Sequence, residues 1–424
     1  MRSVFAAPSS QGYVANLANG LPSWLKFQRA SASTVWTPAS AAFTTLGNDV
    51  PAIDFDPVTG NPLGIAIYGQ VTNQIRNSTV QGAANGTPGT NPTYWTVNGA
   101  GNGLTKSNTL TTVNGIPGIA IRIWGTATAT SSFFIAPEAW NSVVAANGQT
   151  WTQSAYLAIT AGSLGATTFA ISPLAYDSGG AGLLVFGASA VTPTATLARF
   201  VSSGAISGAP TTAYAQPRFR VDYANGTTFD VTIFIGWPQF ELSPTATPYI
   251  QTSGSVATRS ADQLTVDPAA FAGVFGAATS GMGFLDVMIP VLSAIADALY
   301  VGDGSANNTF MLAANNGTGL ACGYGLVSAS IYNTGSAGAV SSATWYRVGL
   351  IWAPFLGGYY VCLNGAAPVG CVNSMPPITQ GMLGNRPYDL ARPVSGYIKQ
   401  VALYPFAAPL ATFRNLCAYG AQLP

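Results

Sequence analysis

The chain has 424 residues, enough for two or three domains, because a single hydrophobic core stops growing at roughly 250 to 300 residues. Apolar residues make up 48% of it, the four charged types only 7%, and the net charge is +1, so Ser, Thr, Asn, Gln and Gly must build the surface. Without a basic cluster the chain lacks the attraction that supplies most affinity for nucleic acid, and nucleic acid is not an expected partner.

The apolar content does not indicate a membrane protein. The most apolar tract, 281–302, is interrupted by Asp286, Pro290 and Asp297, and no apolar run reaches the roughly 18 residues that span a bilayer. We therefore expect buried strands and turns there and no membrane insertion. The start of the chain carries one Arg and a short apolar stretch, which is not the pattern of a secretory signal. An extracellular role would have to be reached by another route, such as cell lysis.

The first 85 residues predict an extended arm. The most distinctive stretch, "IDFDPVTGNPLGIAIYGQVTNQIRNS", covers 53–78. Asp54 and Asp56 share one side of an extended segment, and the Gly and Pro that follow impose turns. The stretch is typical of a docking element, because its amides can hydrogen-bond along a partner with almost no charge to desolvate. The side chains that offer donors and acceptors are Gln70, Thr72, Asn73, Gln74 and Asn77.

Strand patterns dominate the rest of the chain. Alternating or β-branched runs bounded by Gly, Asn or Pro occur at 118–125, 228–237, 344–352 and 358–365. With 48 Gly and 28 Pro there is little room for long helices, and the apolar spacing predicts a helix within 407–420. Many short strands with frequent turn signals indicate sandwiches or barrels.

Polar, loop-like segments at 80–92 and 244–268 mark two boundaries. We therefore expect an all-β protein with an N-terminal extended arm at 1–85. Two antiparallel β-sandwich (jelly-roll) domains follow, at 86–262 and 263–424, both of ordinary sandwich size.

Catalytic chemistry has little support. The chain has no histidine, so the common Ser and Cys triads are excluded. Its two glutamates, Glu138 and Glu241, lie outside the last block. We expect no catalytic residue and no cofactor. The alternative to a non-enzymatic protein is a glycan-degrading enzyme, a depolymerase or glycoside hydrolase with an Asp-based site. The candidate catalytic residues of such a site are Asp286, Asp297, Asp303 and Asp389.

Metal binding is not expected either. Asp54 with Asp56, and the segment 303–308, offer oxygen ligands for calcium, but ordinary turn chemistry explains both. The cysteines have no CxxC spacing and no supporting His, so they do not predict a zinc site. Cys362 and Cys371 flank a hairpin loop and are expected to face each other across two strands, as free thiols or as a disulfide formed after release from the cell. The other cysteines are Cys322 and Cys417.

Aromatic side chains are the candidates for ligand contact, because sugar rings stack on exposed Trp and Tyr faces. Trp124, Trp345 and Trp352 lie inside strand patterns and are expected in the core. Three others lie in loop-like contexts and are the predicted glycan-binding residues: Trp140, Tyr176 and Tyr388.

The opening of the chain resembles that of a family of bacteriophage and prophage virion proteins. In that family an F-x-R-A-S segment precedes a D-F/Y-D-P-x-T-x-x-P-x-G-L/I-x-I-E-x-x-x-T-N-x-L/I segment. This chain has "FQRASASTVW" at 27–36 and the 53–78 stretch, with Tyr68 or Gly69 where family members usually carry an acid. The matching positions are Phe27, Arg29, Ala30, Ser31, Thr34, Asp54, Phe55, Asp56, Pro57, Pro62, Gly64, Ile67, Thr72, Asn73 and Ile75.

The later blocks also resemble that family. Segments 151–162 and 234–264, with Gln239, Glu241 and a T-R-x-A-D signature ending at Asp262, are similar to its carbohydrate-binding-module-like jelly roll. The last block resembles a concanavalin-A-like or laminin-G-like sandwich.

The resemblance implies a non-enzymatic structural protein, assembled in the host cytoplasm and exposed on the exterior of a virion as a head or tail fibre or a capsid decoration. The arm would dock on capsid, portal or tail proteins, and the sandwiches would recognise a host cell-surface glycan. A homotrimer is implied, with weak sites made useful by many copies. A purely cementing decoration protein is an open alternative. The implied docking residues are Phe27, Arg29, Asp54, Asp56, Gln70, Asn73 and Asn77.

Overall fold

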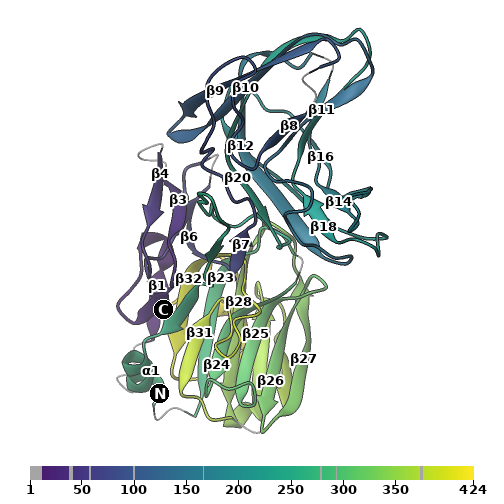
Figure 1. Cartoon of the computed structure of the whole chain (residues 1–424). Coiled ribbons are helices and arrows are strands. Elements are labelled where there is room, and N and C mark those ends of the chain that lie inside the picture. The colour runs from purple at the N-terminus through teal and green to yellow at the C-terminus, as the bar shows by residue number, and fades with distance from the viewer. Residues whose placement is uncertain are drawn as a thin grey trace. The chain divides into compact units, whose positions relative to one another are not determined.

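A computed structural model describes residues 12–37, 42–56, 59–98, 101–165, 167–276, 279–292, 294–372 and 376–424. These residues form two compact units (Figure 1). Unit 1 contains 12–37, 45–70 and 260–424, and unit 2 contains 42–44 and 71–259. The all-β prediction is confirmed, because antiparallel strands make up nearly all of the regular structure in both units.

Unit 1 is built from two sheets. The larger has the order β30 (Val369–Val372), β29 (Gly358–Leu363), β28 (Trp345–Ala353), β23 (Gly281–Met288), β32 (Gly396–Tyr404), β6 (Pro62–Ile67) and β5 (Ile53–Phe55), and β1 (Tyr13–Asn16) pairs with β32. The smaller has the order β2 (Leu25–Gln28), β22 (Gln263–Val266), β31 (Gln380–Leu383), β24 (Ile295–Gly302), β25 (Thr309–Asn316), β26 (Leu320–Val327) and β27 (Ser330–Ala339).

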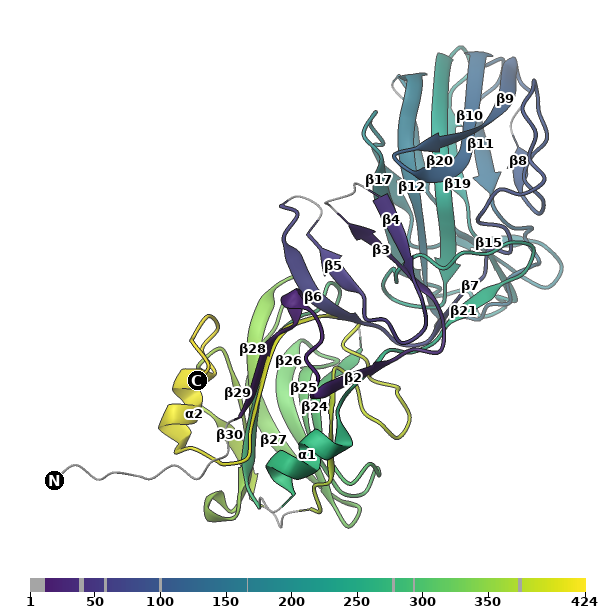
Figure 2. The same cartoon turned by 90° about the vertical axis from the view of Figure 1, so that its left-hand side faces the viewer.

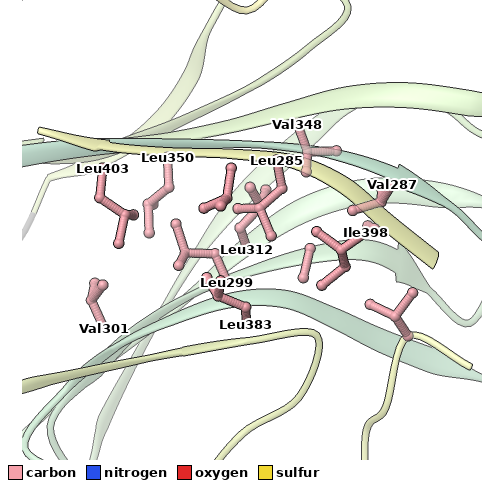
Figure 3. Packing of buried hydrophobic residues seen from close by; sticks show 14 of the residues in the cluster. Leu285, Val287, Leu299, Val301, Leu312, Val348, Leu350, Leu383, Ile398 and Leu403 are labelled. Carbon is pink, nitrogen blue, oxygen red and sulfur yellow. The ribbon is translucent and has the colours of Figure 1, made fainter. Parts of the chain in front are cut away.

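The main core of unit 1 lies between these sheets (Figure 3). Leu285 on β23 and Leu350 on β28 pack with Leu299 and Val301 on β24. Each fully buried aliphatic side chain contributes about 1.5 to 3 kcal/mol. Because side chains alternate along a strand, Tyr300 between Leu299 and Val301 belongs to a different cluster on the other face of the smaller sheet.

Short helices close unit 1. Helix α1 (Pro268–Phe275) begins where the Asp267 carboxylate accepts the backbone N–H groups of Ala269 and Ala270, and Phe271 enters the core. Helix α2 (Leu410–Leu416), shown in Figure 2, confirms the helical spacing predicted within 407–420. Its Phe413 packs on the other face of the larger sheet. The 3-10 turns η1 (Leu17–Asn19) and η3 (Pro354–Leu356) also belong to this unit.

Residues expected to form an extended arm contribute strands to both sheets of unit 1. β2 pairs with β22, and β6 pairs with β32. The physical reason is the alternation of buried apolar residues such as Phe27 and Ile65, which lie in the same core as the C-terminal strands. The unit boundaries fall at 70/71 and 259/260, whereas the sequence placed them at 85 and 262.

Unit 2 has two five-stranded sheets and a small third sheet. The first, side by side in Figure 2, has the order β17 (Ala198–Ala205), β12 (Thr150–Ser163), β20 (Thr228–Glu241), β10 (Ile116–Thr126) and β9 (Leu104–Val113). The second has the order β16 (Ser189–Val191), β13 (Thr168–Ile171), β19 (Phe219–Tyr223), β11 (Ser131–Ala136) and β8 (Thr96–Asn98). The third joins β15 (Gly182–Val185), β14 (Leu174–Tyr176) and β18 (Tyr214–Gln216).

Ile121 and Ile123 of β10 share the main core of unit 2 with Phe219 and Val221 of β19. β7 (Val71–Asn73) pairs with β21 (Ala257–Arg259). Of the remaining strands, β3 (Ser33–Thr37) belongs to unit 1, and β4 (Ala42–Leu46) begins in unit 2 and ends in unit 1.

Two expectations about buried residues need correction. Cys371 lies opposite Tyr359, so Cys362 and Cys371 do not face each other, and all four cysteines carry free thiols. Trp352 is buried in the core as expected, whereas Trp345 is half-buried at the start of β28. No helix in the described part of the chain is long and apolar enough to cross a membrane.

Candidate functional site

Three aromatic side chains from separate segments of unit 2 meet at one place. Trp140 follows β11, Tyr176 ends β14 and Tyr214 begins β18. The ring centroid of Trp140 lies 5.6 Å from that of Tyr176 and 5.7 Å from that of Tyr214. All three side chains are half-buried, which leaves part of each ring open to solvent. We call these three residues the aromatic group.

Local strand geometry brings the two tyrosines together. β14 and β18 are neighbours (Figure 1), and Tyr176 lies directly opposite Tyr214. Ala175 and Ala215 are fully buried in the core, so the flanking tyrosines point to the other face. Trp140 then joins them from the loop after β11.

The loop after β14 leaves space for the Trp140 ring. The Asp177 side chain accepts the backbone N–H groups of Gly179 and Ala181, both at 2.9 Å, which closes a tight turn. At Gly180, φ is +89°, and an added Cβ would lie 2.9 Å from the Trp140 ring. A glycine is therefore required there by both the backbone conformation and the aromatic contact.

Hydrogen bonds hold Tyr176 of the aromatic group in place. The Tyr176 hydroxyl donates to Oε1 of Gln216 at 3.0 Å, and the Gln216 amide donates to the backbone carbonyl of Glu138 at 3.0 Å. Glu138 is two residues before Trp140, and its buried carboxylate accepts from Arg76 at 2.7 Å. These Glu138 hydrogen bonds raise the pKa of Arg76. The Tyr176 ring is therefore preorganised before any ligand arrives.

Arg218 lies near Tyr176 of the aromatic group. Its Nε donates to the Ser172 carbonyl at 3.1 Å, and its backbone N–H donates to the Gln153 side chain. Burial lowers the pKa of Arg218, while the nearby Tyr176 side chain opposes that shift. One guanidinium nitrogen, Nη2, is buried and has no hydrogen-bond partner among the described residues.

The chemistry available at this place is binding. Aromatic faces stack on the apolar faces of sugar rings, and polar tips orient the ring. The Trp140 indole N–H and the Tyr214 hydroxyl make no hydrogen bond among the described residues, so both remain available to a ligand. The nearby Glu138 carboxylate is already committed to Arg76.

The structure brings together two of the three predicted glycan-binding residues. Trp140 and Tyr176 belong to the aromatic group, whereas Tyr388 lies in unit 1. There the centroid of its ring is 6.4 Å from that of the Tyr300 ring, and its hydroxyl is 3.8 Å from the Met311 sulfur. The sequence reasoning missed Tyr214, which the alternation in "TAYAQ" (212–216) would have placed on one face with Gln216.

Four of the predicted docking residues are buried. Phe27 lies in the unit 1 core, and the fully buried Arg29 pairs with Asp262 at 3.4 Å. The side chain of Asn73 donates to the Ile250 carbonyl at 2.9 Å and that of Asn77 to the Gln81 carbonyl at 2.9 Å. These side chains stabilise the chain's own fold, because their polar groups are buried and satisfied there.

The other three docking residues lie at or near the surface. Asp54 is half-buried and accepts the Tyr397 hydroxyl at 3.0 Å. Asp56 is half-buried and accepts the backbone N–H of Thr59 at 2.7 Å. Gln70 is exposed.

The aspartates named for an enzymatic alternative have different environments. Asp286 is held by Arg347 through contacts of 2.6 and 2.9 Å, and Asp389 pairs with Arg386. Asp303 closes a turn by accepting the backbone N–H of Ser305. Asp297 is fully buried, and burial raises its pKa to about 7. No group of three or more potential metal ligands occurs within the described ranges.

No protein-family model and no curated protein matches the chain. Among solved structures it is similar to the CBM40 module of the Ruminococcus gnavus IT-sialidase bound to α2,3 sialyllactose, with 18% identity, a TM-score of 0.28, and coverage of 34% of this chain and 84% of that one.

It is also similar to domains LG4-5 of the mouse laminin α1 chain, with 10% identity, a TM-score of 0.25, and coverage of 74% of this chain and 97% of that one. A third similar structure is the CBM22-1-CBM22-2 tandem of Paenibacillus barcinonensis Xyn10C, with 11% identity, a TM-score of 0.25, and coverage of 77% and 99%. At these identities and TM-scores, neither residues nor ligands are transferred from those proteins to this chain.

Proposed function

We propose that the protein binds glycan through the aromatic group of unit 2. The observation that carries this proposal is the convergence of three half-buried rings, Trp140, Tyr176 and Tyr214. Tyr176 is also held by hydrogen bonds that lead through Gln216 to Glu138, whose buried carboxylate pairs with Arg76. Rigid rings with free polar tips bind a sugar ring with little loss of side-chain freedom. The near absence of charge favours a partner recognised by shape, hydroxyls and amides.

We further propose that this binding serves a non-enzymatic structural protein on the exterior of a phage virion. The resemblance of 27–36 and 53–78 to virion proteins supports the setting, and low charge limits repulsion between crowded identical subunits. A homotrimer would multiply weak sites. Docking on capsid, portal or tail proteins would use surface residues of the N-terminal segment, such as Gln70, because its buried members are engaged inside the fold.

A glycan array followed by titration calorimetry with the best binder tests the glycan proposal. Trp140→Ala and Tyr214→Ala should each weaken binding about fivefold, since an aromatic contact contributes about 1 kcal/mol. Phe355→Ala is the control, because this unit 1 side chain is 67% exposed and distant in sequence from the aromatic group. Equal affinity of all three variants and the parent protein would contradict the proposal.

The virion setting has its own test. Immunogold labelling of purified particles should place the protein on their exterior, and particles without it should fail to bind cells. Silence on the array, together with particles that fall apart when the protein is deleted, would favour the cementing alternative.

An enzyme remains the second candidate because the pKa values of two carboxyls are shifted in opposite directions. Burial raises that of Asp297 to about 7, while hydrogen bonding to Arg386 lowers that of Asp389 against the effect of burial. Such opposed pairs are used as acids and bases in glycosidases. Shortening of a host polysaccharide by the purified protein, abolished in Asp297→Asn, would support the enzyme over the binding protein.

A further inference from the structure

Unit 2 has a cleft that shares no residue with the aromatic group. Its volume is about 390 Å³, which is within the size range of small-molecule sites. It lies at the ends of β10, β12 and β20. Its lining residues are Trp124, Gly125, Ser163, Gly165, Thr228, Phe229 and Asp230.

Strand alternation presents Trp124 to this cleft. Ile121 and Ile123 of β10 enter the core, so Arg122 and Trp124 belong to the other face of the sheet. Trp124 is half-buried, which corrects the expectation that it is a core residue. The Arg122 guanidinium lies 4.5 Å from the centroid of the Trp124 ring, in a cation–π contact.

A solvent-exposed ion pair stands beside the tryptophan. Asp230 lies directly opposite Trp124 in the sheet, and Arg122 donates to its two oxygens at 2.8 and 2.6 Å. The two side chains are 46% and 53% exposed. Their mutual hydrogen bonds raise the pKa of Arg122 and lower that of Asp230, so both stay charged while their charges cancel. The pair can therefore offer N–H donors and carboxylate acceptors to a ligand without favouring a charged ligand over a neutral one.

Glycines and hydroxyls form the rest of the cleft. At Gly165 an added Cβ would meet nothing within 4 Å, so this wall is open. Ser163 and Thr228 add hydroxyl groups that are exposed. An aromatic face beside paired donors and acceptors matches a sugar ring with one apolar face and hydroxyls on adjacent carbons.

We infer that this cleft is a second saccharide site, which takes an uncharged pyranose whose adjacent hydroxyls bridge Arg122 and Asp230. The inference rests on the proposed function for the general class of ligand, but it uses different residues. It would make a single unit 2 bivalent for glycan, which raises the avidity of each copy for a surface that carries many sugars.

Saturation-transfer NMR and tryptophan fluorescence with defined glycosides test this site in the full-length chain. The probes are the methyl glycosides of glucose, galactose, mannose and glucuronic acid, and each is titrated against the parent protein and the variants Trp124→Ala, Asp230→Asn and Trp140→Ala. At least one neutral glycoside should bind the parent. Trp124→Ala should weaken it about fivefold and Asp230→Asn about tenfold, while Trp140→Ala leaves this site unchanged.

This experiment can refute the second site and the proposed function independently of each other. If neutral glycosides bind and only Trp140→Ala weakens them, the second site is refuted and the proposed function stands. If only Trp124→Ala and Asp230→Asn weaken them, the second site stands without the first. Tighter binding of glucuronate than of glucoside, or no neutral glycoside bound at all, would overturn the inference. Unchanged thermal unfolding of Asp230→Asn confirms that its loss of binding is local, because its side chain is exposed.

Discussion

The buried carboxyl of Asp297 should make the protein less stable as the pH rises. It lies on β24 at an irregularity in the strand register, and neither of its carboxylate oxygens has a hydrogen-bond partner among the described residues. Its backbone N–H donates to the Arg392 carbonyl at 2.9 Å, which ties β24 to the segment that carries Arg386 and Asp389. Burial raises the pKa of Asp297 to about 7, while Arg392 and Arg386 oppose the shift and Asp389 reinforces it.

The sign of the effect follows from proton binding. The unfolded chain releases this proton near pH 4, whereas the folded chain keeps it until about pH 7, so the contribution of Asp297 to stability falls as pH rises through that window. A pKa raised from 3.8 to about 7 corresponds to a loss of about 4 kcal/mol above the window. Asp297→Asn removes this loss because the amide does not ionise.

Urea unfolding measures the effect. The free energy of unfolding of Asp297→Asn relative to the parent should rise by several kcal/mol between about pH 4 and about pH 8, up to the ~4 kcal/mol worked out above. Asp303→Asn is the matched control: hydrogen bonds lower the pKa of Asp303 below its usual value, so its contribution changes only below about pH 4, and the difference between Asp303→Asn and the parent should stay constant between about pH 4 and about pH 8. A difference between Asp297→Asn and the parent that does not change with pH would refute the reasoning.

Three further predictions concern the Arg29–Asp262 ion pair, the buried amide of Asn73, and Gly180. Arg29→Met should destabilise unit 1 by about 3 to 5 kcal/mol in urea unfolding because it removes the Arg29 guanidinium from the buried Asp262 carboxylate, and the double variant with Asp262→Leu should recover part of that loss. Asn73→Ala should cost about 3 kcal/mol, since its amide serves several buried backbone groups; a loss below about 1 kcal/mol would contradict this role. Gly180→Ala should weaken glycan binding by displacing Trp140, whereas Gly208→Ala, also at positive φ but with nothing within 4 Å of an added Cβ, should lose only stability.

Two sequence motifs that lie far apart in the chain are in contact in the fold. The F-x-R-A-S motif contains Arg29 and the T-R-x-A-D motif contains Asp262, and the sequence places the two motifs in different blocks, 1–85 and 86–262. In the fold Arg29 donates to the Asp262 carboxylate, whose other oxygen accepts the backbone N–H of Tyr68 at 2.8 Å. Both motifs therefore stabilise unit 1, and this explains why Arg29 is buried and not available for docking.

Local chemistry in the sequence determined the all-β class, the frequent turns, the helix at Leu410–Leu416 and the partial exposure of Trp140 and Tyr176, because strand alternation and turn residues act within a few positions of each other. Only the tertiary structure decided that Tyr214 joins Trp140 and Tyr176, that Trp124 lines a cleft, and that β1, β2, β5 and β6 complete the sheets of the C-terminal sandwich. The physical reason is that pairing and register between strands far apart in the chain depend on which apolar faces pack together in a shared core, and no local pattern encodes that choice.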